Sequence, residues 1–356
     1  NIRQKHITLS AVLLTCIISL RNQFGLLFYR PNRNTIKLYT PDHPSRLLYF
    51  NLNTDAPHDG HPIEMSKLKH NTVIAAVVSN DINEVEKLKN ALTSLHHLRG
   101  DDDDAEFTAH VLVFNEGDLS NHQIQTLIEC TRRPIAFPYV DLSSLPSGFN
   151  PDNIDAVQNK ISREQALRSR LVNRFWLNTV WTHPAIGPYG VVMKVDPHSC
   201  FMEDNEHLPH PLISYSEYHS QYIGHHPSNE KISLDGLFNY TAEWLLRVKA
   251  ASNPMMWQYV KTTWQQQGTL PIFRTGLEVF GEGYMKRNGI RKYVDDLTER
   301  EPFGVLSKGW NYQALRFMMA GIFFQNEMIV TTKAKGYGWE ELCEKDKYDA
   351  RFKRPR

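Results

Sequence analysis

The stretch YGVVMKVDPHSCF, from Tyr189 to Phe201, decides the fold that we expect for this chain of 356 residues. Its β-branched and apolar run, Val191 to Val195, predicts a buried central strand. The strand should end at Asp196-Pro197-His198, because proline cannot donate to a strand ladder. Ligands of open α/β sheets bind outside the carboxyl ends of the strands, where oxygen and nitrogen ligands suit a divalent metal that holds phosphates. We therefore expect Asp196 and His198 to lie at a ligand site, and a solvated proline turn is the alternative.

Strand and helix patterns alternate on the N-terminal side of this stretch. Apolar runs predict strands at Val73 to Val78, His110 to Asn115 and Ile135 to Val140, with helices between them at Asn83 to Leu98 and His122 to Cys130. A polar helix, roughly Asn159 to Trp181, then leads into the central strand. This alternation predicts a parallel, three-layer α/β sheet. Because no GxGxxG or P-loop sequence is present, a phosphate-bearing ligand would need a metal.

Bulk composition narrows the functional classes. The net charge of +1 gives no electrostatic argument for binding nucleic acid. The four cysteines have no CxxC spacing, so we expect no zinc site, and no disulfide pairing can be read from the sequence.

The N-terminal region predicts a membrane anchor. Arg3 and Lys5 precede the apolar run Ile7 to Leu20, and a second apolar piece ending at Tyr29 brings it to bilayer-spanning length. We expect a cytoplasmic tail at 1–6, a signal anchor at 7–29 and a lumenal body in the Golgi or endoplasmic reticulum, which makes a single-pass type II membrane protein. A cleaved signal peptide and a buried helix are the alternatives. Residues 30–70 should form a stem, 71–340 a single domain and 341–356 a charged tail.

The order of several short motifs resembles a known family. Asn173-Arg174-Phe175-Trp176 and Thr182-His183-Pro184 precede the central strand; Ile272 to Val279, Gly309 to Tyr312 and Gly336-Tyr337-Gly338 follow it. Between about Asn71 and Trp339, this order resembles the fungal Golgi α-1,2-mannosyltransferases of glycosyltransferase family 15. That family has Tyr-Trp-Arg-Val-Glu-Pro-Asp at the central strand, and later Phe-Trp-Ser-Asn-Phe-Glu-Ile, Arg-Trp-Gly-Asp and Gly-Tyr-His.

The resemblance implies a fold, a reaction and a set of site residues. It implies a GT-A fold, with a mixed, Rossmann-like sheet flanked by helices. It also implies a retaining transfer of a hexose, first of all mannose from GDP-mannose, onto a glycan of a glycoprotein. Glu278 would be the catalytic carboxylate on the face of the donor sugar opposite the diphosphate, and Mn²⁺ would be held by Asp196 and His198. The remaining expected contacts are Ser79, Asn80, Asp81, Arg174, Trp176 and Lys194 for the nucleotide sugar, and Trp310 and Tyr337 for the acceptor.

Three positions depart from the family pattern. The family's metal-binding histidine is Gly338 here, its tyrosine near the nucleotide is Trp176, and its acid after Trp-Gly is replaced by Asn311 or Tyr312. A catalytically inactive GT-A domain that binds a glycan or a partner protein is therefore the alternative, and a transferase that uses another sugar nucleotide is a third hypothesis.

Overall fold

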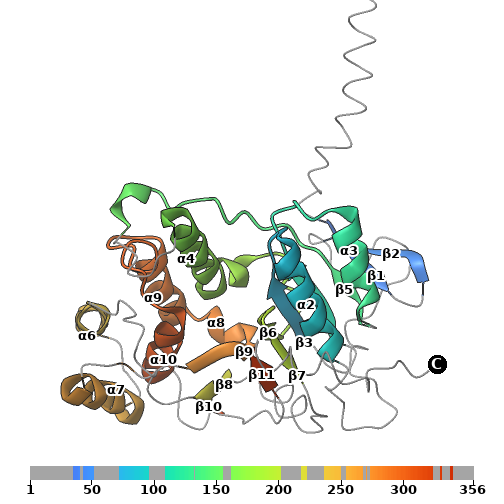
Figure 1. Cartoon of the computed structure of the whole chain (residues 1–356). Helices are drawn as coiled ribbons and strands as arrows, with labels where there is room; N and C mark the ends of the chain where they lie inside the picture. Colours follow the sequence, from blue (N-terminus) through green and yellow to red (C-terminus); the bar gives the residue numbers. More distant parts are fainter. Residues whose placement is uncertain are drawn as a thin grey trace, which may run out of the picture.

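A nine-stranded mixed sheet forms the centre of the described structure (Figure 1). The computed structural model describes residues 35–40, 43–51, 72–95, 109–131, 133–154, 162–201, 218–222, 236–249, 254–267, 270, 273–323, 329–330 and 337–339. The expected anchor at 7–29 and the expected tail at 341–356 lie outside these residues. In the part of the chain that the structure describes, no helix combines the length and apolar character needed to cross a bilayer.

The strand order in the sheet is β10-β8-β9-β6-β3-β4-β5-β1-β2. The bounds are β1 Thr35–Thr40, β2 His43–Asn51, β3 Thr72–Val77, β4 His110–Phe114, β5 Ile135–Ala136, β6 Val191–Val195, β8 Tyr218–Tyr222, β9 Phe273–Gly281 and β10 Ile329–Val330. A separate pair joins β7 (Ser199–Phe201) and β11 (Tyr337–Trp339). Strands β1 and β2 lie within the segment that was expected to be a stem, and β1 pairs with β5.

The predicted parallel strands are present, and they lie in a mixed sheet, as the GT-A resemblance implies. Strands β6, β3, β4 and β5 pair in parallel, whereas β9 pairs antiparallel to β6. The predicted strand at Ile135 to Val140 shortens to Ile135–Ala136 plus a single bridge between Asn115 and Tyr139. Pro138, which has no N–H to donate, interrupts it.

Helices cover both faces of the sheet, which is why β3, β4 and β6 are buried along almost their whole length and are mostly apolar. One face carries α2 (Ile82–Ser94) and α3 (Asn121–Glu129); the other carries α4 (Arg163–Leu177), α9 (Asn288–Thr298) and α10 (Tyr312–Phe323). Between α4 and β6 lies the short 3₁₀ helix η4 (Thr179–Thr182), and between β9 and α9 lies α8 (Glu282–Met285). Helices α6 (Leu237–Val248) and α7 (Pro254–Gln267) and the 3₁₀ turn η3 (Pro151–Asn153) complete the described elements.

Side chains of β6 alternate between the two faces because successive residues of a strand point to opposite sides. Met193 joins the core under α2, and Val192 joins the core under α4 and α10. Residue 194 therefore points toward α4 and α10, as does residue 278 of β9, because Lys194 and Glu278 are paired in register. Parallel pairing also brings the carboxyl ends of β3, β4 and β6 to one edge of the sheet.

Candidate active site

A buried charged cluster occupies the face of the β6–β9 seam that α4 and α10 cover. Glu278 is 0% exposed and Lys194 is 6% exposed. The Tyr312 hydroxyl donates to Oε2 of Glu278 at 2.5 Å, and Nη2 of Arg316 donates to the Tyr312 oxygen at 2.7 Å. Lys194 places Nζ 4.7 Å from the ring centre of Tyr312 and 5.4 Å from that of Trp176. Two basic side chains, a phenol and a carboxylate are thus enclosed together.

Burying these charged and polar groups costs desolvation free energy, because water is excluded from every residue of the cluster. Burial raises the pKa of Glu278, and the charges of Lys194 and Arg316, with the Tyr312 hydrogen bond, oppose that rise. Burial lowers the pKa of Lys194, which the negative charges of Glu278 and Asp196 oppose. Burial also raises the pKa of Tyr312 well above its ordinary value, so the phenol keeps its proton and remains a donor. Such perturbed groups concentrate at functional sites.

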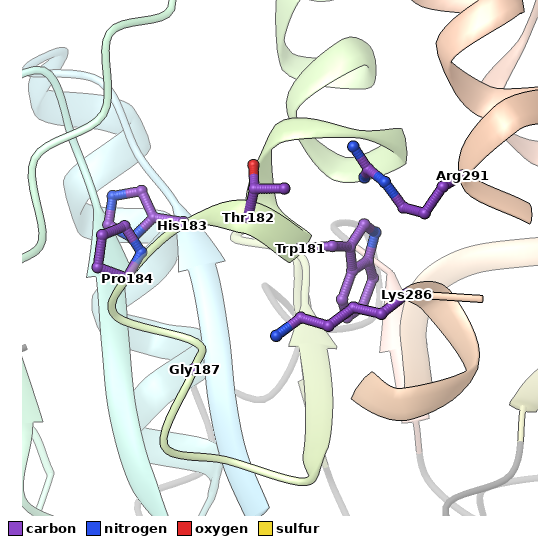
Figure 2. Close-up of a pocket in the computed structure, with 7 residues that line it drawn as sticks. All are labelled: Trp181, Thr182, His183, Pro184, Gly187, Lys286 and Arg291. Atoms are coloured by element: carbon purple, nitrogen blue, oxygen red, sulfur yellow. The ribbon is translucent and has the colours of Figure 1, made fainter. Parts of the chain in front are cut away.

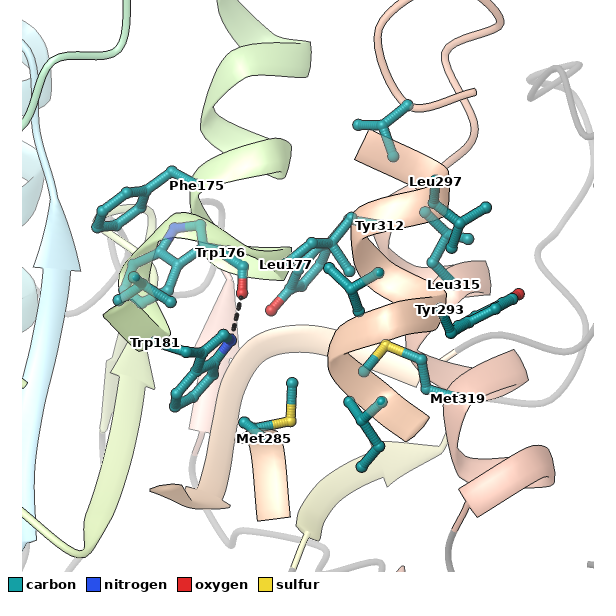
Figure 3. Packing of buried hydrophobic residues seen from close by; sticks show 14 of the residues in the cluster. Phe175, Trp176, Leu177, Trp181, Met285, Tyr293, Leu297, Tyr312, Leu315 and Met319 are labelled. Carbon is teal, nitrogen blue, oxygen red and sulfur yellow. Dashed lines mark hydrogen bonds between the residues drawn. The ribbon is translucent and has the colours of Figure 1, made fainter. Parts of the chain in front are cut away.

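Trp176 forms one wall of this cluster. Its side chain is 4% exposed, and its carbonyl accepts from Nε1 of Trp181 at 3.2 Å and from Nη2 of Arg316 at 2.9 Å. Figure 3 shows Trp176, Trp181 and Tyr312 gathered between α4 and α10. The expected donor residues Trp176 and Lys194 are therefore brought together with the expected catalytic residue Glu278.

Ser79, Asn80 and Asp81 lie at the carboxyl end of β3, at the edge where a nucleotide was expected. Asp81 caps α2: its Oδ1 accepts from the N–H of Asn83 at 2.7 Å and from that of Glu84 at 3.2 Å. Asn80 and Asp81 are exposed and Ser79 is partly exposed, so the segment faces solvent. It lies at the edge of the sheet, whereas the charged cluster lies beneath the helical face.

Asp196 and His198 follow β6 at the same edge, and each is already engaged by other protein groups. Oδ1 of Asp196 accepts from the N–H of His198 at 2.9 Å and closes the turn. The imidazole is directed toward α2, with Nε2 3.3 Å from Oε2 of Glu84 and Nδ1 3.3 Å from Nζ of Lys87. The hydrogen bond to Glu84 raises the pKa of His198, and the same bond lowers that of Glu84. Both ring nitrogens are engaged by protein groups.

No group of three or more His, Cys, Asp or Glu side chains suited to holding a metal occurs in the described ranges. Gly338, at the family's histidine position, pairs with Cys200 in the β7–β11 ladder, beside the turn that carries Asp196. This position offers no side-chain ligand, so Asp196 stands without the expected partner among these residues.

Arg174 is committed to an ion pair rather than to the edge of the sheet. Its Nε and Nη2 donate to the two carboxylate oxygens of Glu299 at 2.8 and 2.7 Å, and Nη1 donates to the carbonyl of Ser144 at 2.8 Å. Burial alone would raise the pKa of Glu299, but these bonds, with those of Thr298 and Asn178, lower it overall. The guanidinium thus ties α4 to the end of α9.

The two expected acceptor residues differ in what the structure shows. Trp310 is 3% exposed and packs against Tyr240 at a ring-centre distance of 5.2 Å, as a core residue does. Tyr337 pairs with Phe201 across the β7–β11 ladder, which brings its backbone to the strand that follows the Asp196 turn.

A cavity of about 500 Å³ opens elsewhere, between η4, the turn that follows it, and the α8–α9 segment (Figure 2). It is lined by Trp181, Thr182, His183, Pro184, Gly187, Lys286 and Arg291, and it contains none of the expected site residues. Its two basic residues are paired on their own helices, Lys286 with Glu282 and Arg291 with Asp295. Three of its lining residues, Thr182, His183 and Pro184, form the motif that was noted before the central strand for its resemblance to the fungal family.

Solved structures of fungal mannosyltransferases are similar in fold to this chain, although sequence comparisons find no match. No family model matches the sequence, and no curated protein matches it. A solved structure of core-mannan synthase A (CmsA/Ktr4) from Aspergillus fumigatus, in its Mn/GDP form, is 15% identical with a TM-score of 0.64, covering 75% of this chain and 74% of that one. The mannosyltransferase Ktr4p from S. cerevisiae is 15% identical with a TM-score of 0.56, covering 76% and 70%. This chain has the fold of these mannosyltransferases. The expected resemblance to the fungal family is confirmed at the level of the fold.

Sequence reasoning missed one member of the cluster, Arg316. It lies within the run ALRFMMAGIFF, where a lone arginine among apolar residues indicates a buried charge that needs a partner. The sequence singled out Tyr312 only as one of two residues that replace the fungal family's acid after Trp-Gly. Tyr312 and Arg316 both contact Glu278, which is distant from them in sequence, so no local sequence pattern connects the three residues.

Proposed function

We propose that this protein is a retaining glycosyltransferase that moves a hexose from a sugar nucleotide onto a glycan of a glycoprotein, with mannose from GDP-mannose as the first candidate. One observation carries the proposal: a carboxylate, Glu278, is fully buried between Lys194, Tyr312 and Arg316 in a fold shared with two fungal mannosyltransferases. Burying a carboxylate among fixed donors is expensive for folding alone, and such arrangements recur where charge develops in a transition state.

The reaction breaks the bond between the anomeric carbon and the diphosphate, and it joins that carbon to an acceptor hydroxyl oxygen. The hydroxyl proton leaves with the departing diphosphate. Positive charge grows on the anomeric carbon as the leaving group departs, and the fixed negative charge of Glu278 stabilises it in a water-poor site. The positive charge of Lys194 on β6 offsets negative charge of the sugar-nucleotide donor. Ser79, Asn80 and Asp81 offer exposed polar groups for the nucleoside at the edge.

Manganese is part of this proposal only as an expectation. The solved Aspergillus fumigatus neighbour is an Mn/GDP form. In this chain Asp196 lies at the edge formed by the carboxyl ends of the strands, and the His198 ring is held by Glu84 and Lys87. A divalent metal bound at Asp196 would neutralise charge on the diphosphate as it leaves.

The test compares transfer with binding. We expect the wild type to transfer mannose from GDP-mannose to a mannoside acceptor. Glu278→Gln keeps the side-chain shape and removes the charge, so kcat should fall at least about a hundredfold, or roughly 3 kcal/mol of transition-state stabilisation. Donor affinity should change only severalfold, because the ground-state donor lacks the positive charge. Glu86→Gln, on the exposed side of α2, is the matched control and should leave kcat unchanged.

Two results would contradict the proposal in different ways. A wild type that binds sugar nucleotides but transfers nothing across a panel of donors would favour the inactive binding domain. An active wild type with an equally active Glu278→Gln variant would keep the transferase and remove Glu278 from its chemistry.

We also propose that the body lies in the lumen of the Golgi or endoplasmic reticulum, behind the apolar segment 7–29. Cys200 is disulfide-bonded, and disulfides persist in oxidising compartments. Asn239, in a glycosylation sequon with Thr241, is exposed on α6. In sealed vesicles from a secretory cell, the body should resist added protease until detergent is supplied. Digestion without detergent would refute this placement.

A further inference from the structure

The two carboxylate oxygens of Glu278 have different surroundings. Oε2 accepts the Tyr312 hydroxyl at 2.5 Å and lies 3.8 Å from Nε of Arg316. Oε1 is buried, and no described group forms a hydrogen bond with it. Buried carboxylate oxygens in protein cores normally have partners, so an oxygen left over beside a saturated one requires an explanation.

The donors that hold Oε2 form a short chain with a fixed direction. Tyr312 and Arg316 are four residues apart on α10, so they share one face of the helix. An arginine can only donate, so the Tyr312 oxygen accepts from Nη2 of Arg316 and must direct its single proton to Glu278. The same Nη2 donates to the carbonyl of Trp176 at 2.9 Å, which anchors the guanidinium to the last turn of α4. The charged donor at the start of the chain strengthens the bond at its end.

We propose that Tyr312 and Arg316 are positioning residues that fix Oε2 of Glu278, so that Oε1 is the oxygen presented to the anomeric carbon of the donor sugar. This inference rests on the proposed transferase function. A purely structural ion cluster would gain most by saturating both oxygens. Here one oxygen is saturated through a relay that spans α10, β9 and α4, and the other is left with its hydrogen-bonding capacity unused.

The first test removes only the relay. Tyr312→Phe deletes one hydroxyl from the buried cluster, and Tyr293→Phe deletes one from an equally buried tyrosine on α9 that bonds Thr241 at 2.8 Å. We expect Tyr312→Phe to lower kcat at least about tenfold while the KM for the donor changes less than about threefold. Tyr293→Phe should leave kcat within about twofold of the wild type, whatever it does to the melting temperature.

A pH profile separates positioning from general destabilisation. The described groups that face Glu278 are Lys194 from β6 and Tyr312 and Arg316 from α10. The Tyr312 bond lowers the pKa of Glu278, so its removal should raise that pKa further. The acidic limb of kcat should then move to higher pH in Tyr312→Phe, with part of the lost rate returning as the pH rises. Tyr293→Phe should leave the limb in place.

Arg316→Lys provides the second variant should Tyr312→Phe unfold. Lysine keeps the charge, but its shorter, flexible side chain lacks the planar guanidinium whose Nη2 bonds both Tyr312 and the carbonyl of Trp176. We therefore expect kcat to fall again by more than the donor KM changes. If the wild type is active and both variants match Tyr293→Phe in kcat and in pH profile, the positioning inference is overturned and the transferase stands. If the wild type transfers no sugar from any donor, the proposed function and this inference fail together.

Discussion

Removing the Arg174 guanidinium should destabilise the fold measurably and in a pH-dependent way. Arg174→Met keeps most of the side-chain stem and deletes the fork that grips Glu299. The pair is well shielded, with side-chain exposures of 12% for Arg174 and 27% for Glu299. Arg163, whose pairing with Asp152 leaves side chains 54% and 84% exposed, is the matched control in the same helix.

The magnitude follows from the bonds that are lost. Two charge-assisted hydrogen bonds join Arg174 to Glu299 and a third reaches the carbonyl of Ser144. A hydrogen bond to a charged group contributes about 1.5–3 kcal/mol and a neutral one about 1 kcal/mol. Glu299 keeps its bond from Asn178 at 3.0 Å and some access to water, which reduces the loss. We expect Arg174→Met to lower the free energy of unfolding by about 2–3 kcal/mol at neutral pH, and Arg163→Met by less than about 0.5 kcal/mol.

Urea unfolding at a series of pH values is the assay. The pKa of Glu299 is lowered in the folded protein from its ordinary value of 4.5. Its contribution is therefore complete above pH 4.5 and is lost as the pH falls through the folded-state value. The difference between wild type and Arg174→Met should shrink toward the contribution of the Ser144 bond as Glu299 becomes protonated. A loss below about 0.5 kcal/mol at neutral pH, or one independent of pH, would refute the ion-pair reasoning. If Arg174→Met instead binds the sugar nucleotide less tightly and is as stable as the wild type, Arg174 is a nucleotide-binding residue, as the sequence predicted.

Two further predictions concern the core and the edge of the sheet. At Gly304 a Cβ would overlap the ring of the buried Trp310, so Gly304→Ala should lower the free energy of unfolding, measured in urea, by about 2–3 kcal/mol. A Cβ at Gly283 would meet no other atom, so Gly283→Ala is the control and should not be destabilising. Equal effects of the two substitutions would show that the Trp310 ring moves aside. In titrations of GDP in the presence of Mn²⁺, Asp196→Ala should weaken GDP binding. His198→Ala should leave GDP binding unchanged, because Glu84 and Lys87 already engage the imidazole. A large loss of affinity in His198→Ala would identify His198 as a metal ligand.

The parts of the fold that were predictable are those with local signals. The runs at Val73, His110 and Val191 became β3, β4 and β6 to within about a residue, because buried parallel strands are apolar throughout. Helix α2 begins at Ile82, one residue before the predicted Asn83, and is capped by Asp81. It continues to Ser94, with Leu95 at its C-cap, and residues 96–98 of the predicted helix lie outside the described residues.

The antiparallel strand β9 was not predictable in the same way. Nothing within Phe273 to Gly281 encodes direction; its pairing with β6 in the register Lys194 to Glu278 is a property of the assembled sheet. The same limit applies to the candidate site. Glu278 could be singled out by resemblance, but its bond from Tyr312 joins residues 34 positions apart. For Arg174, the resemblance predicted a contact with the nucleotide sugar, and only the position of Glu299, at the C-cap of α9, shows where the guanidinium is directed.

The antiparallel seam also determines how the protein can vary. Val195 pairs with Leu277, and the N–H of Asp196 donates to the carbonyl of Gly276 at 2.9 Å, so the chain leaves the sheet and re-enters it at neighbouring points. Between Phe201 and Phe273 the chain returns to the sheet as β8 and packs α6 against the core, so only the connections between these elements are excursions whose ends the fold holds in place. The entropy of closing such an excursion grows only with the logarithm of its length, about 0.6 kcal/mol for each doubling. Evolution can therefore lengthen or shorten these connections at little thermodynamic penalty, without disturbing the strands that carry Lys194 and Glu278.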